Sequence, residues 1–178
     1  MAKIPIELVR PTAALESSYR SYVAEFVDRG EPFIPFPIGF DLSDFSALLK
    51  KLDDCSKGVG LPDGFVAHST FWLLRDGTEV VGVSSLRHSL TPRLVREGGN
   101  IGYGIRPSAR GQGLGAEILR RTLDRAAAIG LKEALVTCDK ANVASARVIL
   151  RNGGVLDSEI FIEERGVLLQ RYWIRGLG

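Results

Sequence analysis

The sequence of 178 residues has few cysteines, and it does not begin with a long apolar segment. Its two cysteines, Cys55 and Cys138, are too few for the disulfide framework of a secreted protein. Residues 1–7, Met-Ala-Lys-Ile-Pro-Ile-Glu, lack the uninterrupted apolar core of a signal peptide. We therefore expect a cytoplasmic protein with no membrane partner.

The sequence also lacks a strong excess of charge of either sign. It has 23 Lys and Arg against 21 Asp and Glu, a net charge of +2, and the basic residues are scattered. Nucleic-acid-binding domains usually carry a basic patch, so we expect no nucleic-acid partner. Internal repeats and low-complexity tracts are missing as well. With 45% hydrophobic and 25% charged residues, the chain is expected to form one domain over residues 1–178.

The most informative segment is the glycine-rich run Arg110-Gly111-Gln112-Gly113-Leu114-Gly115. A strand-like run from Ile101 to Ile105 precedes it, and a helix-like run from Ala116 to Ala128 follows it. Glycine leaves the backbone open to a ligand, and the unpaired N–H groups and positive dipole end of a helix start attract anions. The segment therefore predicts a phosphate site that a pyrophosphate would fit.

Two common phosphate-binding motifs do not match this run. A Walker loop requires Gly-x-x-x-x-Gly-Lys-Ser/Thr, and no Lys-Ser or Lys-Thr follows these glycines. The dinucleotide fingerprint Gly-x-Gly-x-x-Gly is missed by one position, and Asp139 is the one acidic residue that ends an apolar strand at a suitable distance. A glycine-rich turn that only caps a helix remains an alternative.

Together with the preceding Ile105-Arg106-Pro107, the run reads Arg-x-x-Gly-x-Gly, which resembles the acetyl-CoA-binding signature of the GNAT superfamily of N-acetyltransferases. Further along, the strand-like run from Glu133 to Asp139 precedes Asn142-Val-Ala-Ser145, which resembles the next strand and helix of that family. The resemblance covers Phe71 to Ile174. Several short segments within this range resemble those of a bacterial GNAT subgroup whose substrates are mostly unassigned.

The resemblance implies an α/β (α+β) fold with a mixed, mostly antiparallel central sheet of about six to seven strands flanked by about four helices. Asp76-Gly77-Thr78 favours a tight hairpin turn. Three prolines in residues 31–38 exclude regular helix and central strand there. Hydrophobic patterning predicts strands at 6–9, 70–75, 79–87, 101–105, 133–139, 155–162 and 167–174, and helices at 13–27, 42–55, 116–128 and from 142 onward.

The resemblance also implies acetyl-CoA as cosubstrate, no metal, and transfer of the acetyl group to a primary amine by direct attack in a ternary complex. The acceptor can be a small amine, an amino acid, an antibiotic or a protein lysine, and a homodimer is possible. Asn142 can cap a helix, contact the cofactor, or do both. The implied cofactor-binding residues are Ile105, Arg110, Gly111, Gln112, Gly113, Leu114, Gly115, Asn142 and Ser145.

The catalytic candidates are Ile105, Tyr103 and His88. By resemblance, the fourth strand is expected to splay away at Ile105 and to expose the backbone N–H of this residue, which would stabilise the oxyanion. A lysine-like amine must lose its proton, at a cost of about 4–5 kcal/mol at pH 7, and Tyr103 and His88 are candidate bases. His88 has an equally good alternative as a surface hydrogen-bonding residue. Cys138 is expected to be a buried thiol rather than a nucleophile.

The sequence departs from the family pattern at Ile149. Many GNAT enzymes have a tyrosine there, seven residues after the asparagine, as general acid. A thiolate with a pKa of about 8.5 is already a fair leaving group, so Tyr172 or a water can take over this role. The alternative function is a non-catalytic acyl-CoA-binding regulatory protein.

Overall fold

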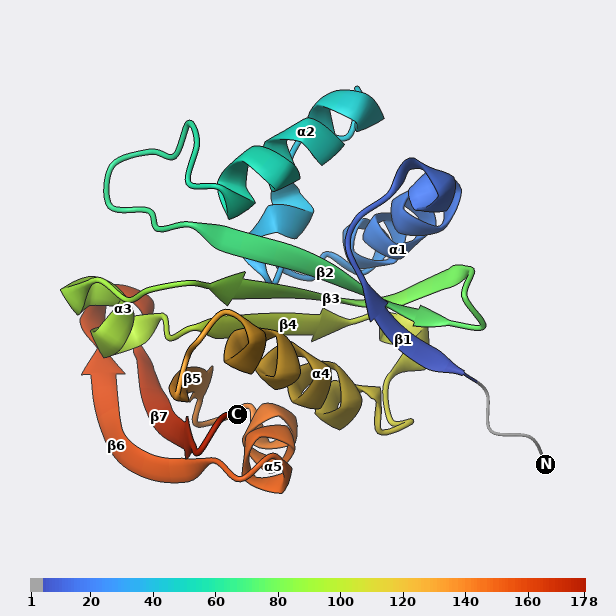
Figure 1. Ribbon diagram of the computed structural model, residues 1–178. Coiled ribbons are helices and arrows are strands. Elements are labelled where there is room, and N and C mark those ends of the chain that lie inside the picture. Colours follow the sequence, from blue (N-terminus) through green and yellow to red (C-terminus); the bar gives the residue numbers. More distant parts are fainter. Residues whose placement is uncertain (1–4) are drawn as a thin grey trace.

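The structure is a computed structural model that describes residues 5–178, with seven strands and five α-helices (Figure 1). The strands are β1 (Ile6–Val9), β2 (His68–Arg75), β3 (Glu79–Arg87), β4 (Ile101–Ile105), β5 (Glu133–Asp139), β6 (Val155–Ile162) and β7 (Val167–Arg175). The α-helices are α1 (Glu16–Arg29), α2 (Phe45–Ser56), α3 (Pro92–Glu97), α4 (Leu114–Ala128) and α5 (Val143–Arg151). Short 3-10 helices lie at Ala13–Leu15, Phe36–Gly39, Pro107–Ala109 and Glu163–Arg165.

The strands form two sheets in which every pair is antiparallel. The first sheet has the order β1-β2-β3-β4, and the second has the order β5-β7-β6. The predicted hairpin joins β2 to β3, and both Asp76 (φ 55°) and Gly77 (φ 67°) take the positive backbone angles that such a turn requires. The α+β fold and the number of strands are thus confirmed.

Helices cover both faces of the first sheet. Figure 1 shows α1 and α2 on one face and α4 on the other. On the α1 face, the ring of Tyr19 stacks on the fully buried Trp72 of β2 at a centroid distance of 4.3 Å. On the α4 face, the predicted apolar stripe is confirmed, because Leu114, Ile118, Leu119, Leu123 and Ala126 are all buried.

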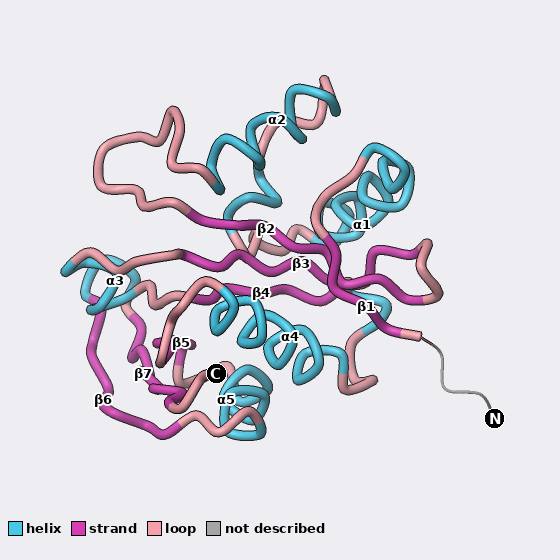
Figure 2. The backbone as a smooth tube through the Cα atoms, in the orientation of Figure 1, coloured by secondary structure: helices cyan, strands magenta, loops and turns pink. Residues whose placement is uncertain are grey.

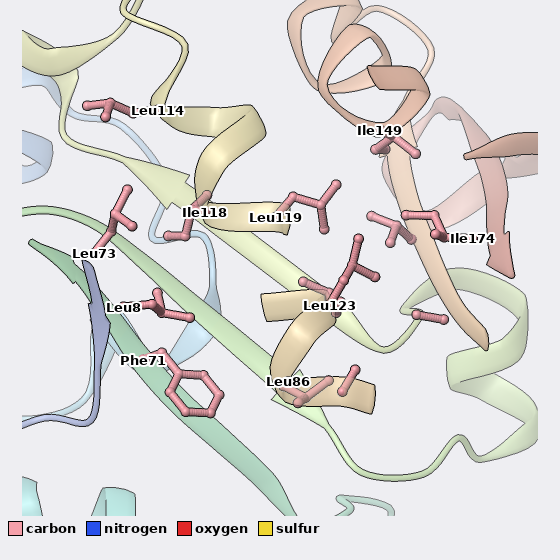
Figure 3. Close-up of a cluster of buried hydrophobic side chains, with 14 of the residues drawn as sticks. Leu8, Phe71, Leu73, Leu86, Leu114, Ile118, Leu119, Leu123, Ile149 and Ile174 are labelled. Atoms are coloured by element: carbon pink, nitrogen blue, oxygen red, sulfur yellow. The ribbon is translucent and has the colours of Figure 1, made fainter. Parts of the chain in front are cut away.

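The core beneath α4 joins the two sheets. Figure 3 shows Leu73 and Leu86 of the first sheet on one side of α4, and Ile149 of α5 and Ile174 of β7 on the other. Each fully buried aliphatic side chain contributes about 1.5–3 kcal/mol through removal of its apolar surface from water. Helix α4 therefore lies between the two sheets and shares one hydrophobic core with both.

The structure differs from the expected architecture in three places. The expected central sheet is divided in two, because β4 splays away, as the resemblance implied, so far that it shares no ladder with β5. The helix expected from Ala13 begins as a 3-10 turn and becomes α1 only at Glu16, and the helix expected from Ala116 begins at Leu114. Helix α3, which makes five helices rather than about four, was not predicted because its six residues are too short for a periodic pattern.

Candidate functional site

The glycine-rich loop ends at the N-terminus of α4, with Gly113 as the N-cap residue. Gly111 and Gly113 both have φ of 78°, and a Cβ atom at either position would meet no neighbouring atom. No side chain caps the helix, so the N–H groups of its first turn at Leu114 and Gly115 face outward without a capping partner. This open, positively polarised end can accept an anion, as the sequence predicted.

The loop is anchored to α1 by a buried cation, Arg106, that sequence reasoning did not single out. Its guanidinium donates to Glu79 Oε1 at 3.0 Å and to Ser21 Oγ at 2.8 Å. Glu25 of α1 accepts hydrogen bonds from the backbone and the hydroxyl of Ser108, both at 3.0 Å. These contacts fix the end of β4 and the beginning of the loop.

Arg110 also links the loop to the end of α1. Its guanidinium forms two hydrogen bonds with the carboxylate of Glu31, at 3.0 and 2.6 Å, and its Nε donates to the carbonyl of Ile105 at 3.2 Å. The hydrogen bonds from Arg110 lower the pKa of Glu31. The side chain thus lies against the end of α1, and it can position the loop without pointing at a ligand.

The remaining loop residues have distinct surroundings. Gln112 is exposed and accepts a hydrogen bond of 3.2 Å from Arg75. Leu114 is buried in the core beneath α4. A Cβ atom on Gly115 would lie 3.0 Å from Cγ2 of Val148, so this glycine also sets how closely α4 and α5 pack. The glycines therefore serve two purposes, exposure of backbone and helix packing.

Strand β4 has one free edge, which faces β5. Arg106 N donates to Val81 O at 2.8 Å and Arg87 N donates to Asn100 O at 2.7 Å, so the even-numbered residues of β4 pair with β3. Because antiparallel pairing alternates, the N–H and C=O groups of Tyr103 and Ile105 point away from β3. The N–H of Ile105 therefore faces the gap between the sheets, as an oxyanion donor would need to.

The gap closes at the beginning of β4. Asn100 N donates to Leu135 O at 2.7 Å, and the side-chain Oδ1 of Asn100 accepts from Leu135 N at 2.9 Å. Beyond this point no ladder joins β4 to β5. The two strands thus form a V that is closed at Asn100 and open toward the glycine-rich loop.

A proline-containing strap covers the face of β4 opposite α4. A Cβ atom on Gly104 would overlap the carbonyl oxygen of Ile34, and one on Gly102 would lie 3.4 Å from Cβ of Pro35. Tyr22 of α1 donates a hydrogen bond of 3.2 Å to the carbonyl of Gly104. The segment 31–38 contains no regular helix or strand beyond the 3-10 turn that starts at Phe36, as its prolines predicted.

The N-terminus of α5 lies across the gap from β4. The side-chain oxygen of Asn142 accepts a hydrogen bond of 3.1 Å from Ser145 N, which confirms the N-cap. The amide nitrogen of Asn142 is left available at an exposed position. Ser145 Oγ lies 2.9 Å from Tyr103 Oη, so one hydrogen bond joins β4 to α5 across the gap. The structure thus brings Tyr103, Ser145 and Asn142 together.

The proton-handling candidates differ in environment. Burial raises the pKa of Tyr103 to about 12, although the hydrogen bond between Tyr103 and Ser145 opposes this shift. Burial likewise raises the pKa of the Cys138 thiol to about 11. Tyr172 donates to Gln170 Oε1 at 2.7 Å, and Ile149 is fully buried in the core. The hydroxyls of Tyr103 and Tyr172 and the thiol of Cys138 are therefore protonated at neutral pH.

His88 is not brought near the other candidates. Its Nε2 shares a hydrogen bond of 2.8 Å with Ser69 Oγ. It lies four residues beyond Ser84, the partner of Tyr103 in the sheet, which corresponds to about 13 Å along the strand. Burial lowers the pKa of His88 and favours the neutral imidazole. The structure places it at the closed end of the V.

The described residues offer neither a metal site nor a membrane-spanning helix. Residues 5–178 contain no group of three or more His, Cys, Asp and Glu side chains arranged to hold a metal ion. Over the same range, no helix is long and apolar enough to cross a membrane.

Comparison with known proteins identifies the family. The model of the acetyltransferase (GNAT) domain matches residues 39–155. No curated protein matches the chain by sequence. Solved structures share the fold at low identity. The ribosomal alpha-N-protein acetyltransferase RimL in complex with coenzyme A has a TM-score of 0.71 at 17% identity and covers 98% of this chain and 95% of its own.

Two further structures are similar. The microcin C7 self-immunity acetyltransferase MccE, in complex with acetyl-CoA and AMP, has a TM-score of 0.67 at 15% identity, over 96% of this chain and 92% of its own. Spermidine N-acetyltransferase from Vibrio cholerae has a TM-score of 0.63 at 15% identity, over 96% of this chain and 93% of its own. The family match, the split sheets and the glycine-rich loop agree, and the chain belongs to the GNAT family of acetyl-CoA-dependent acetyltransferases.

Proposed function

We propose that this protein transfers an acetyl group from acetyl-CoA to a primary amine by direct attack in a ternary complex. The observation that carries the proposal is the continuity between the free edge of β4 and the open N-terminus of α4. The N–H of Ile105 and the N–H groups that follow Gly113 lie at opposite ends of one short stretch of chain. One ligand with an acyl group at one end and phosphates at the other can therefore use both.

The two ends suit different parts of acetyl-CoA. The pyrophosphate would lie at Gly111, Gly113 and the first turn of α4, where backbone N–H groups and the helix dipole favour negative charge. The pantetheine arm would follow the edge of β4, where the backbone groups of Tyr103 are free to pair with an amide. The amide nitrogen of Asn142 would contact the arm from the other side of the V.

The chemical step places negative charge first on the acetyl oxygen and then on the sulfur. The attacking nitrogen forms a bond to the acetyl carbon, and the N–H of Ile105 would stabilise the oxyanion. When the carbon–sulfur bond breaks, the thiolate takes the electron pair. Tyr103 keeps its proton at neutral pH because burial raises its pKa to about 12, so its hydroxyl suits donation to this sulfur better than removal of a proton.

The amine proton needs a separate route. Because His88 lies at the closed end of the V and hydrogen-bonds to Ser69, a chain of waters leading to bulk solvent is the route that we propose. The Tyr103–Ser145 pair would compensate for the absence of a tyrosine at Ile149. The alternative, a non-catalytic acyl-CoA-binding regulator, is supported by this same missing tyrosine and predicts binding without turnover.

The names of similar proteins include a protein alpha-amino acetyltransferase and a polyamine acetyltransferase, so both acceptor types belong in the assay. Acetyl-CoA should raise the melting temperature, whereas NADH and ATP should not. Release of free CoA thiol is then measured against small amines, amino acids, aminoglycosides and peptides. Affinity for CoA without turnover on any of these amines would favour the regulator.

A further inference from the structure

A cavity of about 410 Å³ lies outside the acetyl-transfer cleft, between α2, the 3-10 turn that starts at Phe36, and the loop from Lys57 to Ala67. Figure 2 shows this loop arching beside α2, away from α4 and α5. The volume matches that of a small-molecule site. Neither the glycine-rich loop nor β4 contributes a side chain to it.

Aromatic rings form the inner wall of the cavity. The ring of Phe36 packs edge-on against those of Phe40 and Phe65, each at a centroid distance of 5.8 Å, and against His68 at 5.0 Å. Phe65 nevertheless keeps 49% of its surface exposed, and Val59 keeps 54%. The rings are thus arranged as in a core, yet their apolar surface faces an open space that a flat apolar ligand could cover.

His68 supplies a buried polar atom that has no partner. The residue is 2% exposed, and its Nδ1 lies 2.9 Å from the carbonyl of Val66, which can only accept a hydrogen bond. The ring proton therefore sits on Nδ1, and burial lowers the pKa of His68, so Nε2 is a bare acceptor. Within residues 5–178, Nε2 has no hydrogen-bond partner. A donor on a ligand would relieve the cost of this buried lone pair.

The mouth of the cavity carries a free positive charge. Lys50 is paired with Asp54 at 2.5 Å. Lys51, on the next position of α2, lies with its Nζ 4.0 Å from the ring centroid of Phe40 and forms no ion pair among the residues that the structure describes. A ligand that covers Phe40 would therefore bring an anionic group within reach of Lys51.

From these three features we propose that the cavity is a second binding site, for a flat aromatic carboxylate that carries an N–H or O–H donor. The rings of Phe36, Phe40 and Phe65 would hold the aromatic part. Nε2 of His68 would accept from the donor, and Lys51 would pair with the carboxylate. The site is distinct from the acetyl-CoA cleft, because none of its lining residues belongs to β4, to the glycine-rich loop or to α5.

Isothermal titration calorimetry with indole-3-acetate tests the proposal. Indole-3-acetamide lacks the charge and should bind about fivefold more weakly, whereas naphthalene-1-acetate lacks the donor and should bind about tenfold more weakly. Saturating CoA should leave the affinity for indole-3-acetate unchanged. The failure of acetyl transfer would not affect this result, because no step of the assay involves turnover.

Variants distinguish the site from nonspecific binding. Lys51→Met should weaken indole-3-acetate binding about fivefold, and Lys57→Met, which removes a charge six positions further along the chain, should not. Phe65→Ser changes an exposed ring, so the fold should survive while affinity falls. The proposal is overturned by absence of binding at millimolar ligand, by equal affinity in Lys51→Met, or by displacement of the ligand by CoA.

Discussion

The side chain of Asn100 accepts a hydrogen bond from the backbone of Leu135 and replaces, at a single point, the ladder that β4 and β5 otherwise lack. Both residues are buried, and the Asn100 amide also donates to the carbonyl of Arg87 at 3.3 Å. The position and opening of the V therefore depend on one asparagine. This residue lies at the junction of the two sheets, away from the groups that would contact a ligand.

We predict that Asn100→Ala lowers the free energy of unfolding by about 1–3 kcal/mol, because it leaves the buried N–H of Leu135 without a partner. Urea denaturation followed by circular dichroism measures the loss. Asn142→Ala removes an exposed N-cap and should cost about 1 kcal/mol, which provides a comparison for loss of an asparagine side chain. A wild-type unfolding midpoint for Asn100→Ala would show that the junction does not depend on this side chain.

Gly113→Asp should abolish CoA binding while the protein stays folded. The substitution puts a carboxylate at the open N-terminus of α4, where an anion is expected, and no neighbouring atom obstructs the new Cβ. Gly130→Asp is the matched control, because Gly130 also has a positive φ (91°) and an unobstructed Cβ but follows the opposite end of α4. Both variants should lose similar stability through backbone strain of about 1–2 kcal/mol.

Calorimetry with CoA separates these two variants. Preserved affinity in Gly113→Asp would mean that the loop is only a turn that begins a helix. Equal loss of affinity in Gly130→Asp would attribute the effect to strain.

Gly115→Ala should weaken CoA binding through packing rather than charge. Its Cβ would lie 3.0 Å from Val148 Cγ2, so α5, and Asn142 with it, must shift by a few tenths of an ångström. The double variant Gly115→Ala with Val148→Ala removes the crowding and should recover affinity relative to Gly115→Ala alone. A double-mutant cycle on CoA affinity measures this coupling, and strictly additive effects would contradict it.

Cys138→Ala should retain most of the acetyl-transfer activity. The thiol is buried and burial raises its pKa to about 11, so little thiolate exists at neutral pH to form an acyl-enzyme. Steady-state kinetics and mass spectrometry after incubation with acetyl-CoA provide the measurement. Loss of nearly all turnover, together with an acetylated wild-type protein, would instead establish a covalent route.

Tyr103→Phe should lower kcat while CoA affinity stays close to that of the wild type, because the ring remains and only the hydroxyl is lost. In the wild type, donation from Tyr103 should persist as pH rises and fall only as the pH approaches its raised pKa of about 12. The kcat profile of Tyr103→Phe against pH is the test. An unchanged kcat would remove Tyr103 from the reaction.

Sequence reasoning succeeded where a pattern is local. Apolar, strand-like runs predicted the seven strands, Asp76-Gly77 predicted the hairpin turn, and the stripe on α4 predicted its buried face. Helix α3 was missed because six residues cannot show a helical period. The resemblance implied that the fourth strand splays away, but not which residues close the gap, because the hydrogen bonds that do so join Asn100 to Leu135, which are far apart in the chain.

The candidate site shows the same division. The glycines, the N-cap Asn142 and the strand that ends at Ile105 were recognised from the run of residue types. Glu25 and Glu31, which accept hydrogen bonds from Ser108 and Arg110, were not recognised. Nothing in a sequence indicates which surface carboxylate lies near a residue that is distant in the chain. Arg106 gave one usable signal, an arginine directly after an apolar strand, where a buried charge requires partners.

Hydrogen exchange at the free edge of β4 should report whether the cleft between the two sheets holds a ligand. Amide protons that pair with β3, such as that of Gly104, are held in the sheet, whereas those of Tyr103 and Ile105 face the gap. In deuterated water the latter should exchange early in the free protein, and slowly once a ligand amide or acyl oxygen accepts their hydrogen bonds. Alternate residues of a single strand would then differ in exchange rate, and that difference would vanish when the cleft is filled.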